Sequence, residues 1–253
     1  MKKYRAIISS SVMPPACAAY YRKLTRRKPE ALRYEFIHFP KQVRDFVSLN
    51  KIHSLVSAIL LAAGESKRMG DTDKRFLLYK GKPLVNHVML NLWHSKQSQL
   101  VIVMENNDNN LLNGQENEQI KVVVNPDYQR GMTTSIQVGV AAASENATGY
   151  MICLADQPLI TSEDYNLIIK AFENTYLLNE KCIIVPFFDQ KKGNPVIFSA
   201  HYREVILTHK NMEGCKEIIQ ANKEHIVTID MPNDHILRDV DTPEDYERLE
   251  TRE

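Results

Sequence analysis

Hydrophobic residues form a regular pattern from residue 55 onward, in which short apolar runs alternate with helical stripes. Short apolar runs predict buried strands, whereas apolar positions spaced by three and four predict helices with one buried face. The expected strands are 56–61, 100–104, 120–124, 150–154, 182–186, 194–198 and 225–230. The expected helices are 83–93, 134–143, 161–178, 200–209, 213–221 and one that begins at Thr242. This alternation predicts an α/β fold with a mostly parallel, doubly wound, Rossmann-like sheet covered on both faces.

Two loops that directly follow predicted strands carry residues suited to phosphate and metal. One loop, residues 62–74, follows the first strand, and the Ala155-Asp156 turn follows the strand at 150–154. Ligands of parallel sheets bind beyond the carboxyl ends of the strands. We therefore expect these two loops to converge on one crevice.

The loop at 62–74 combines small residues with cations. The small residues are Ala62, Ala63 and Gly64, and the cations are Lys67, Arg68 and Lys74. Small residues let backbone N–H groups close on a phosphate, and the cations supply charge for further phosphates. The loop matches neither the Walker pattern nor G-x-G-x-x-G. It predicts a nucleoside triphosphate site, and the alternative interpretation is a basic surface loop.

Three carboxylates stand at positions where a metal ion could use them. Asp156 ends an apolar strand, where a hard divalent ion such as Mg²⁺ suits it, although an Asp before Pro158 also forms turns. Asp239 and Asp241 are two residues apart on an extended segment, so both can face one side. Capping of the last helix explains Thr242 but leaves these two carboxylates unexplained.

A further polar segment begins at Gly131 and continues through three hydroxyl residues, Thr133, Thr134 and Ser135. A glycine allows close backbone approach, and hydroxyls with helix N-terminal amides can bind a nucleotide. The alternative interpretation is an ordinary helix cap.

Charge divides the chain into two parts. Residues 1–54 hold twelve Lys/Arg and three Asp/Glu, a net charge of +9, so the remainder carries −8 of the overall +1. The acidic part argues against nucleic-acid binding. We expect residues 1–54 to be a basic, poorly ordered extension or a partner- or membrane-surface-binding arm, and residues 55–253 to form the main domain. No apolar run approaches the length of a membrane span, and a cytoplasmic location is expected.

The four cysteines, Cys17, Cys153, Cys182 and Cys215, match no zinc spacing. Cys153 and Cys182 lie in apolar runs, where a reduced core thiol is expected.

Several motifs along the chain together resemble one protein family. The string Leu61-Ala-Ala-Gly-x-Ser66-x-Arg68-Met-Gly70, followed by Lys74, resembles the opening motif of MobA-like nucleotidyltransferases, and most of all molybdenum cofactor cytidylyltransferases. The other matching segments are Asn125 to Ser135, Ala155 to Pro158, Gly193 to Pro195 and Asp239 to Asp245. The chain departs from the family pattern in two places. Three residues separate Gly70 from Lys74 where two are usual, and Asn194 stands where His is usual.

The resemblance implies a GT-A-like fold and transfer of CMP from CTP to the phosphate of molybdopterin, with Mg²⁺ and release of pyrophosphate. It implies that Arg68 binds the β- and γ-phosphates, that Lys74 binds the α-phosphate, and that Asp156 and Asp241 hold the metal. The implied nucleotide-binding residues are Leu61, Ala62, Ala63, Gly64, Ser66, Gly131 and Ser135. Gly193 and Asn194 are implied to lie on the acceptor side.

Several alternatives stay open at this point. Guanylyltransferase relatives use GTP and usually show Leu-Ala-Gly-Gly, so Ala63 favours CTP here. Nucleotidyltransferases that act on sugar 1-phosphates or isoprenoid precursors share the fold. A non-catalytic nucleotide- or cofactor-binding module is the alternative of another class. A molybdoenzyme or its maturation chaperone is an expected protein partner.

Overall fold

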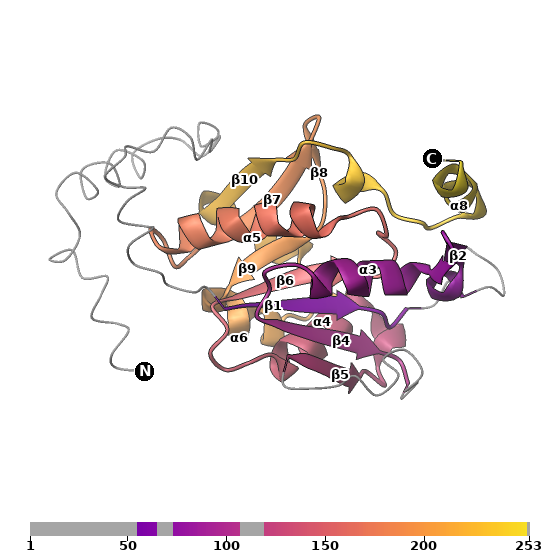
Figure 1. Ribbon diagram of the computed structural model, residues 1–253. Coiled ribbons are helices and arrows are strands. Elements are labelled where there is room, and N and C mark those ends of the chain that lie inside the picture. Colours follow the sequence, from indigo (N-terminus) through magenta and orange to yellow (C-terminus); the bar gives the residue numbers. More distant parts are fainter. Residues whose placement is uncertain (1–54, 65–72, 107–118, 252–253) are drawn as a thin grey trace, which may run out of the picture.

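The computed structural model describes residues 55–64, 73–106 and 119–251 (Figure 1). The expectations for residues 1–54 and for Ser66, Lys67 and Arg68 lie outside the described residues. Within these ranges, no helix is both long and apolar enough to cross a bilayer.

The described elements follow the predicted order. The strands are β1 (Val56–Leu61), β2 (Leu78–Tyr79), β3 (Lys82–Pro83), β4 (Gln99–Met104), β5 (Ile120–Val124), β6 (Gly149–Leu154), β7 (Ile183–Phe188), β8 (Lys191–Lys192), β9 (Val196–Ser199) and β10 (Ile226–Asp230). The α-helices are α3 (Leu84–Trp93), α4 (Met132–Ala142), α5 (Ser162–Tyr176), α6 (Arg203–Thr208), α7 (Lys216–Ala221) and α8 (Pro243–Glu250). Short 3₁₀ turns include η4 (Lys74–Phe76), η5 (Tyr128–Arg130), η6 (Ala200–Tyr202), η7 (Lys223–His225) and η8 (His235–Leu237).

The main sheet has the strand order β10-β7-β9-β6-β1-β4-β5, with β8 attached to β7. Strand β9 runs antiparallel to both β6 and β7, and β8 runs antiparallel to β7, whereas the remaining pairs are parallel. The predicted mostly parallel α/β sheet is therefore confirmed. The carboxyl ends of β1, β4, β5, β6, β7 and β10 consequently share one edge of the sheet, and α8 lies beyond it (Figure 1).

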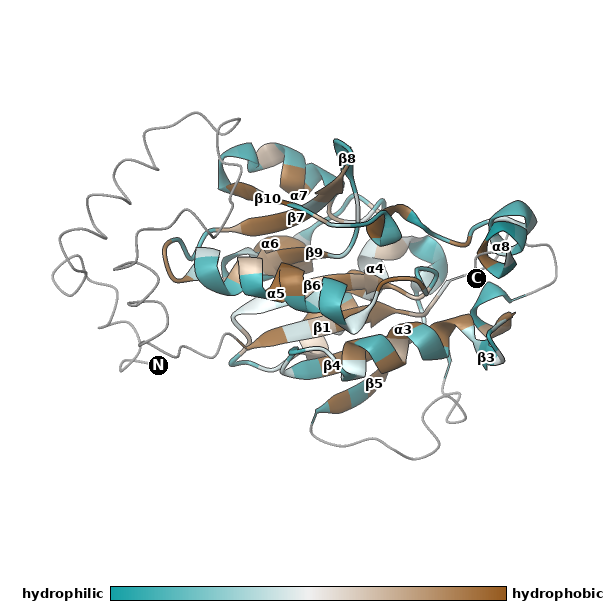
Figure 2. Ribbon diagram, turned by 45° about the horizontal axis from the view of Figure 1, so that its top comes forward, coloured by the Kyte–Doolittle hydropathy of each residue, from teal (hydrophilic) through white to brown (hydrophobic). Residues whose placement is uncertain are grey.

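Helices cover both faces of this sheet, because alternate strand residues point to opposite sides. In β1, Ala58 and Leu60 belong to the core that α3 and α5 cover. Ile59 and Leu61 belong to the opposite core, which α4 and α6 cover. Figure 2 shows the same division, with hydrophobic segments along the strands and hydrophilic segments on the outer helices, α8 above all.

A small third core joins the hairpin β2–β3 to the C-terminal helix. Tyr79, Leu84, Val240 and Leu249 are buried there. The sequence pattern missed this hairpin because strands of two residues show no periodicity. The available signal was Gly81, which follows Lys80, since both have positive φ as a tight hairpin turn requires. This core fixes Val240, and with it the segment that carries Asp239 and Asp241.

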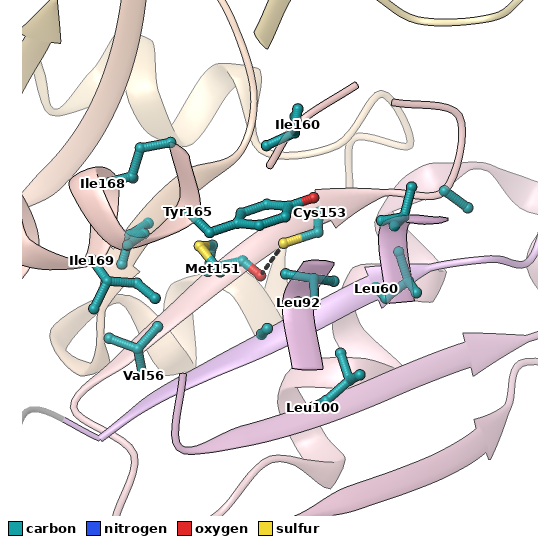
Figure 3. Packing of buried hydrophobic residues seen from close by; sticks show 14 of the residues in the cluster. Val56, Leu60, Leu92, Leu100, Met151, Cys153, Ile160, Tyr165, Ile168 and Ile169 are labelled. Carbon is teal, nitrogen blue, oxygen red and sulfur yellow. Dashed lines mark hydrogen bonds between the residues drawn. The ribbon is translucent and has the colours of Figure 1, made fainter. Parts of the chain in front are cut away.

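The core thiols agree with the prediction. Cys153 and Cys182 are free and buried, and burial raises the pKa of the Cys182 thiol to about 12. The Cys153 thiol donates to the carbonyl of Met151 over 3.6 Å, and the ring of Tyr165 lies beside it (Figure 3). Tyr165 is 1% exposed, and its hydroxyl has no hydrogen-bond partner among the described residues.

Replacing Tyr165 with phenylalanine should leave the free energy of unfolding unchanged or raise it by up to about 1 kcal/mol, because an unsatisfied buried hydroxyl costs free energy. Tyr202 is the matched control, since it is equally buried but its hydroxyl bonds His225 Nδ1 at 2.6 Å. Tyr202→Phe should therefore lose about 1 kcal/mol in denaturant unfolding. A greater loss in Tyr165→Phe than in Tyr202→Phe would contradict this assignment.

Candidate active site

Lys74 stands between two carboxylates at the carboxyl edge of the sheet. Its ammonium Nζ lies 2.7 Å from Asp156 Oδ2 and 2.7 Å from Asp241 Oδ1. The three side chains come from η4, from the turn after β6, and from the segment before α8. The expected convergence of the two loops is thus observed, and Lys74 reaches the site despite the longer spacing from Gly70.

The local fold explains how these three residues meet. The N–H of Val240 donates to the carbonyl of Asp156 over 2.9 Å, which ties the C-terminal segment to the β6 turn. Thr242 then starts α8 with a capping box to Asp245. The side chains of Lys74 and Asp156 are each 19% exposed, and that of Asp241 is 35% exposed. The cluster is therefore partly shielded from water yet accessible to a ligand.

The charges of this cluster influence one another. Burial lowers the pKa of Lys74, but the carboxylates of Asp156 and Asp241 outweigh burial, so the net pKa is raised above 10.5. Partial burial and the negative charges of Asp156 and Asp241 raise the pKa of Asp239. Asp239 therefore lies within electrostatic reach of the same cluster.

The oxygen atoms of the cluster suit a hard divalent cation. Asp156 Oδ2 pairs with Lys74, but Asp156 Oδ1 is buried and has no hydrogen-bond partner among the described residues. A cation and Lys74 can therefore use different oxygens of one carboxylate. No group of three His, Cys, Asp or Glu side chains in the described ranges is arranged to hold a metal. Two carboxylates completed by water and phosphate are the usual protein share of a Mg²⁺ site.

The end of β1 is tightly built into the fold. Leu61 and Ala62 are 9% and 2% exposed, and the Ala62 N–H donates to the carbonyl of Val103 over 2.9 Å. That N–H is therefore used within the sheet, contrary to its expected place in an anion-binding nest. Ala63 is half-buried and Gly64 is exposed, so these two residues present the accessible backbone of the described part of this loop.

Arg75 is the residue near the site that sequence reasoning missed. It is only 8% exposed, and its guanidinium binds Glu105 Oε1 at 2.6 Å, both oxygens of Asp73, and the carbonyl of Ala62. Burial opposes its charge, but the carboxylates of Asp73 and Glu105 outweigh burial and raise its pKa further. The only sequence signal was its position directly after Lys74.

Comparison with known proteins identifies the family. Residues 58–226 match the MobA-like NTP transferase domain. The chain belongs to the MobA-like NTP transferase family. The resemblance predicted from the motif at Leu61 to Gly70 is thereby confirmed, and nucleotidyl transfer is the chemistry of this family.

Relatives within the family carry different names. Nicotine blue oxidoreductase of Paenarthrobacter nicotinovorans is 27% identical over 204 residues, which cover 77% of this chain and 96% of the relative. Molybdenum cofactor cytidylyltransferase of Escherichia coli (strain K12) is 25% identical over 194 residues, 76% of this chain and 94% of the relative. Molybdenum cofactor guanylyltransferase of Aliivibrio fischeri (strain MJ11) is 26% identical over 206 residues, 77% of this chain and 95% of the relative.

Solved structures share the fold. The crystal structure of Rv0371c from Mycobacterium tuberculosis H37Rv has a TM-score of 0.66 and 22% identity, and the match covers 78% of this chain and 98% of that chain. A complex of Rv0371c with manganese has a TM-score of 0.63 and 20% identity, with coverage of 79% and 100%. These likenesses support the predicted α/β fold.

The end of the motif from Asn125 to Ser135 lies at the start of α4. Gly131 has a φ of 131°, and a Cβ there would come within 2.5 Å of the carbonyl oxygen of Met212, so only glycine fits. Ser135 is 2% exposed, and its hydroxyl accepts a hydrogen bond of 2.8 Å from Asn125. Ser135 thus joins α4 to the end of β5, and Gly131 allows the start of α4 to lie against the segment at Met212. Their contact with a nucleotide stays a prediction.

The predicted acceptor-side segment, Gly193 and Asn194, packs against the backbone carbonyl of Ile236. The N–H of Asn194 donates to the carbonyl of Ile236 over 3.2 Å, and a Cβ on Gly193 would come within 2.5 Å of that oxygen. The buried side chain of Gln157 donates to the same carbonyl over 3.3 Å. In this MobA-like fold, Ile236 thus links the β6 turn to the Gly193-Asn194 segment. Their binding of an acceptor stays a prediction.

A second buried carboxylate anchors the segment that leads to Asp241. Asp164 caps α5 through Thr161, as its capping-box spacing predicted, and is 2% exposed. It also accepts a hydrogen bond of 3.0 Å from Asn233 and lies 2.8 Å from His235 Nδ1. Burial raises the pKa of Asp164, but the contacts with His235, Thr161 and Asn233 outweigh burial and lower it below 3.8.

Replacing Asp164 with asparagine should reduce the free energy of unfolding at neutral pH by about 1–3 kcal/mol, because buried partners lose a charged acceptor. The lowered pKa means that this contribution is fully present above pH 3.8 and is lost as pH falls through the lower folded-state pKa. Denaturant unfolding of the two proteins should therefore converge below pH 3.8. Exposed Glu163→Gln is the control on the same helix, and a difference that stays constant with pH would contradict this account.

Proposed function

We propose that this MobA-like protein transfers CMP from CTP to the phosphate of molybdopterin and releases pyrophosphate. The observation that carries the proposal is the Lys74 ammonium held between Asp156 and Asp241 at the carboxyl edge of the sheet. Phosphoryl transfer depends on positioning and on charge stabilisation, and this cluster offers both signs of charge at one place. A module that only docks on another protein needs no such cluster.

The proposed step needs no proton acceptor from the protein. An acceptor phosphate monoester is largely ionised near neutral pH, because its second pKa is about 6. An oxygen of that phosphate forms a bond with the α-phosphorus of CTP, while the bond from this phosphorus to the bridging oxygen breaks and pyrophosphate leaves. We assign Lys74 to the α-phosphate in the transition state and Arg68 to the β- and γ-phosphates. Ser66, Ala63, Gly64, Gly131 and Ser135 are proposed to hold the nucleotide.

Asp156 and Asp241 are proposed to hold Mg²⁺. When bound, the ion would neutralise phosphate charge during transfer. Asp156 Oδ1 is buried and has no hydrogen-bond partner within the described part of the chain, which supports this assignment, as does the oxygen-only donor set. The manganese complex of Rv0371c supports a divalent ion in a protein of this fold, so Mn²⁺ should also serve.

Asp241 rather than Asp239 is proposed as the second metal ligand, because Asp241 contacts Lys74 and Asp239 is the more exposed of the two. Asp241→Asn should raise the Mg²⁺ concentration for half-maximal activity by about 10- to 100-fold. Asp239→Asn is its matched control and should shift this concentration less. A Mg²⁺ titration of pyrophosphate release measures both, and a larger shift in Asp239→Asn would reverse the assignment.

CTP is proposed over GTP because Ala63 stands where guanylyltransferases usually have glycine, and because a cytidylyltransferase is among the relatives. GTP is the second candidate, supported by the guanylyltransferase relatives. We further propose a molybdoenzyme or its maturation chaperone as the recipient of the product, and a basic, dispensable extension for residues 1–54.

Pyrophosphate release with molybdopterin, Mg²⁺ and either CTP or GTP tests the function. We expect release with CTP, and a product heavier than molybdopterin by one CMP. Turnover of GTP alone would replace the nucleotide but keep the reaction class. If neither CTP nor GTP is turned over, the proposal is overturned. The reaction named for nicotine blue oxidoreductase would then be the next one to test. The chain from Leu55 to Glu253 should match the full chain in this assay.

A further inference from the structure

We propose that Arg75 is a positioning residue that fixes Lys74 between Asp156 and Asp241. The contribution of this arrangement to catalysis rests on the proposed function, but the arrangement itself does not. Arg75 is buried and makes contacts in three directions, whereas its neighbour Lys74 extends toward the acidic cluster. The two consecutive side chains thus point into different surroundings from the single turn η4.

The guanidinium of Arg75 connects three segments that are far apart in the sequence. Its Nε lies 2.9 Å from Asp73 Oδ1, its Nη2 lies 2.6 Å from Glu105 Oε1, and its Nη1 donates to the carbonyl of Ala62. Ala62 follows β1 and Glu105 follows β4, whereas Asp73 precedes η4. The guanidinium therefore ties the turn that bears Lys74 to the ends of two neighbouring strands.

The turn itself depends on the same carboxylate. Asp73 Oδ1 accepts a hydrogen bond of 3.1 Å from the Arg75 N–H and so caps η4. If the guanidinium is removed, Asp73 loses its ion pair, and Glu105 is left partly buried without this cation. The backbone at Lys74 is then held at fewer points, although the Lys74 side chain itself is unaltered.

Only arginine can make this set of contacts. Its planar fork presents several donors in fixed directions, whereas a lysine ammonium is a compact point charge on a flexible stem. At 8% exposure the Arg75 side chain has little surface left for a nucleotide. Its role is therefore to position other groups, and Arg75→Lys should not restore it.

Selective acylation of lysines tests the inference without any turnover. The Lys74 side chain is only 19% exposed and is held by two carboxylates, so its reaction with an acylating reagent is hindered. The full-length protein is labelled with an N-hydroxysuccinimide ester, and the rate at Lys74 is measured by peptide mass spectrometry relative to exposed Lys82. Asp156→Asn is the positive control, because it removes one partner of Lys74. Arg248→Met is the matched negative control, because Arg248 is exposed on α8.

In Arg75→Met and Arg75→Lys, Lys74 should be acylated severalfold faster relative to Lys82, because a Lys74 side chain displaced from Asp156 and Asp241 is more accessible to the reagent. Glu105→Gln should increase the acylation rate of Lys74 by a smaller factor. This variant replaces the Arg75 variants in the test if they do not fold. With CTP, the kcat of a folded Arg75 variant should fall by about 10²-fold, since a displaced catalytic group has that order of effect.

An unchanged Lys74 rate in every folded variant, with Asp156→Asn accelerated, overturns the inference. An accelerated Lys74 in a protein that turns over no nucleotide keeps the inference and rejects the proposed function.

Discussion

Asp156→Asn should lower the kcat of pyrophosphate release by about a thousandfold, at the upper end of the effect of removing one preorganised electrostatic group. The two oxygens of the Asp156 carboxylate have separate roles. Its Oδ2 pairs with Lys74 at 2.7 Å, and its buried Oδ1 is the oxygen assigned to the metal. Asparagine keeps the shape and the backbone bond from Val240, but it removes the charge that both roles require.

The control for this variant is Asp189→Asn. Asp189 is exposed in the turn between β7 and β8 and has a φ of 47°, which asparagine also tolerates. It should retain the kcat of the original protein, and the thermal unfolding of Asp156→Asn should show a folded protein. Full activity of a folded Asp156→Asn would contradict the proposed role of Asp156 in pairing with Lys74 and holding the metal ion.

Lys74→Met should reduce kcat/KM for CTP by about 10²- to 10³-fold, because Lys74 is assigned to the charge that develops on the α-phosphate. The variant also leaves Asp156 and Asp241 without their shared ammonium, so the triphosphate meets uncompensated negative charge. Lys74→Arg should recover little, since a forked guanidinium does not replace a point charge between two oxygens. Initial rates at varied CTP concentration give the measurement.

Exposed Lys82→Met is the control for Lys74, and it should leave kcat/KM unchanged. The carboxylates of Asp156 and Asp241 raise the pKa of Lys74, so its ammonium is charged at neutral pH and can meet the α-phosphate as a cation.

The order of the main strands and helices could be predicted because each long element buries a continuous or striped apolar face. Strand β1 and helices α3 and α5 illustrate this, since their buried residues follow the expected periodicities. The antiparallel direction of β9 could not be predicted, because its apolar run reads the same in either direction. The hairpin β2–β3 was missed because its stability comes from contact with Val240 and Leu249, far along the chain.

Residues of the site could likewise be predicted where the local sequence restricts their position, and not where a distant contact determines it. Asp156, Asp241 and Lys74 were predicted because strand ends and spacing restrict where they can lie. Arg75 was missed because its burial depends on Glu105, thirty residues away, and nothing in the local pattern distinguishes it from an exposed arginine. The helix cap at Asp164 was visible as a capping box, but its contact with His235 was not.

Anomalous diffraction from crystals grown with Mn²⁺ and a non-hydrolysable CTP analogue would locate the metal ion. We expect one strong manganese peak beside the carboxylates of Asp156 and Asp241, in contact with the phosphates, and its loss in Asp156→Asn. A nucleotide bound at Ala63 and Gly64 with its manganese away from both carboxylates would disprove the proposed metal site.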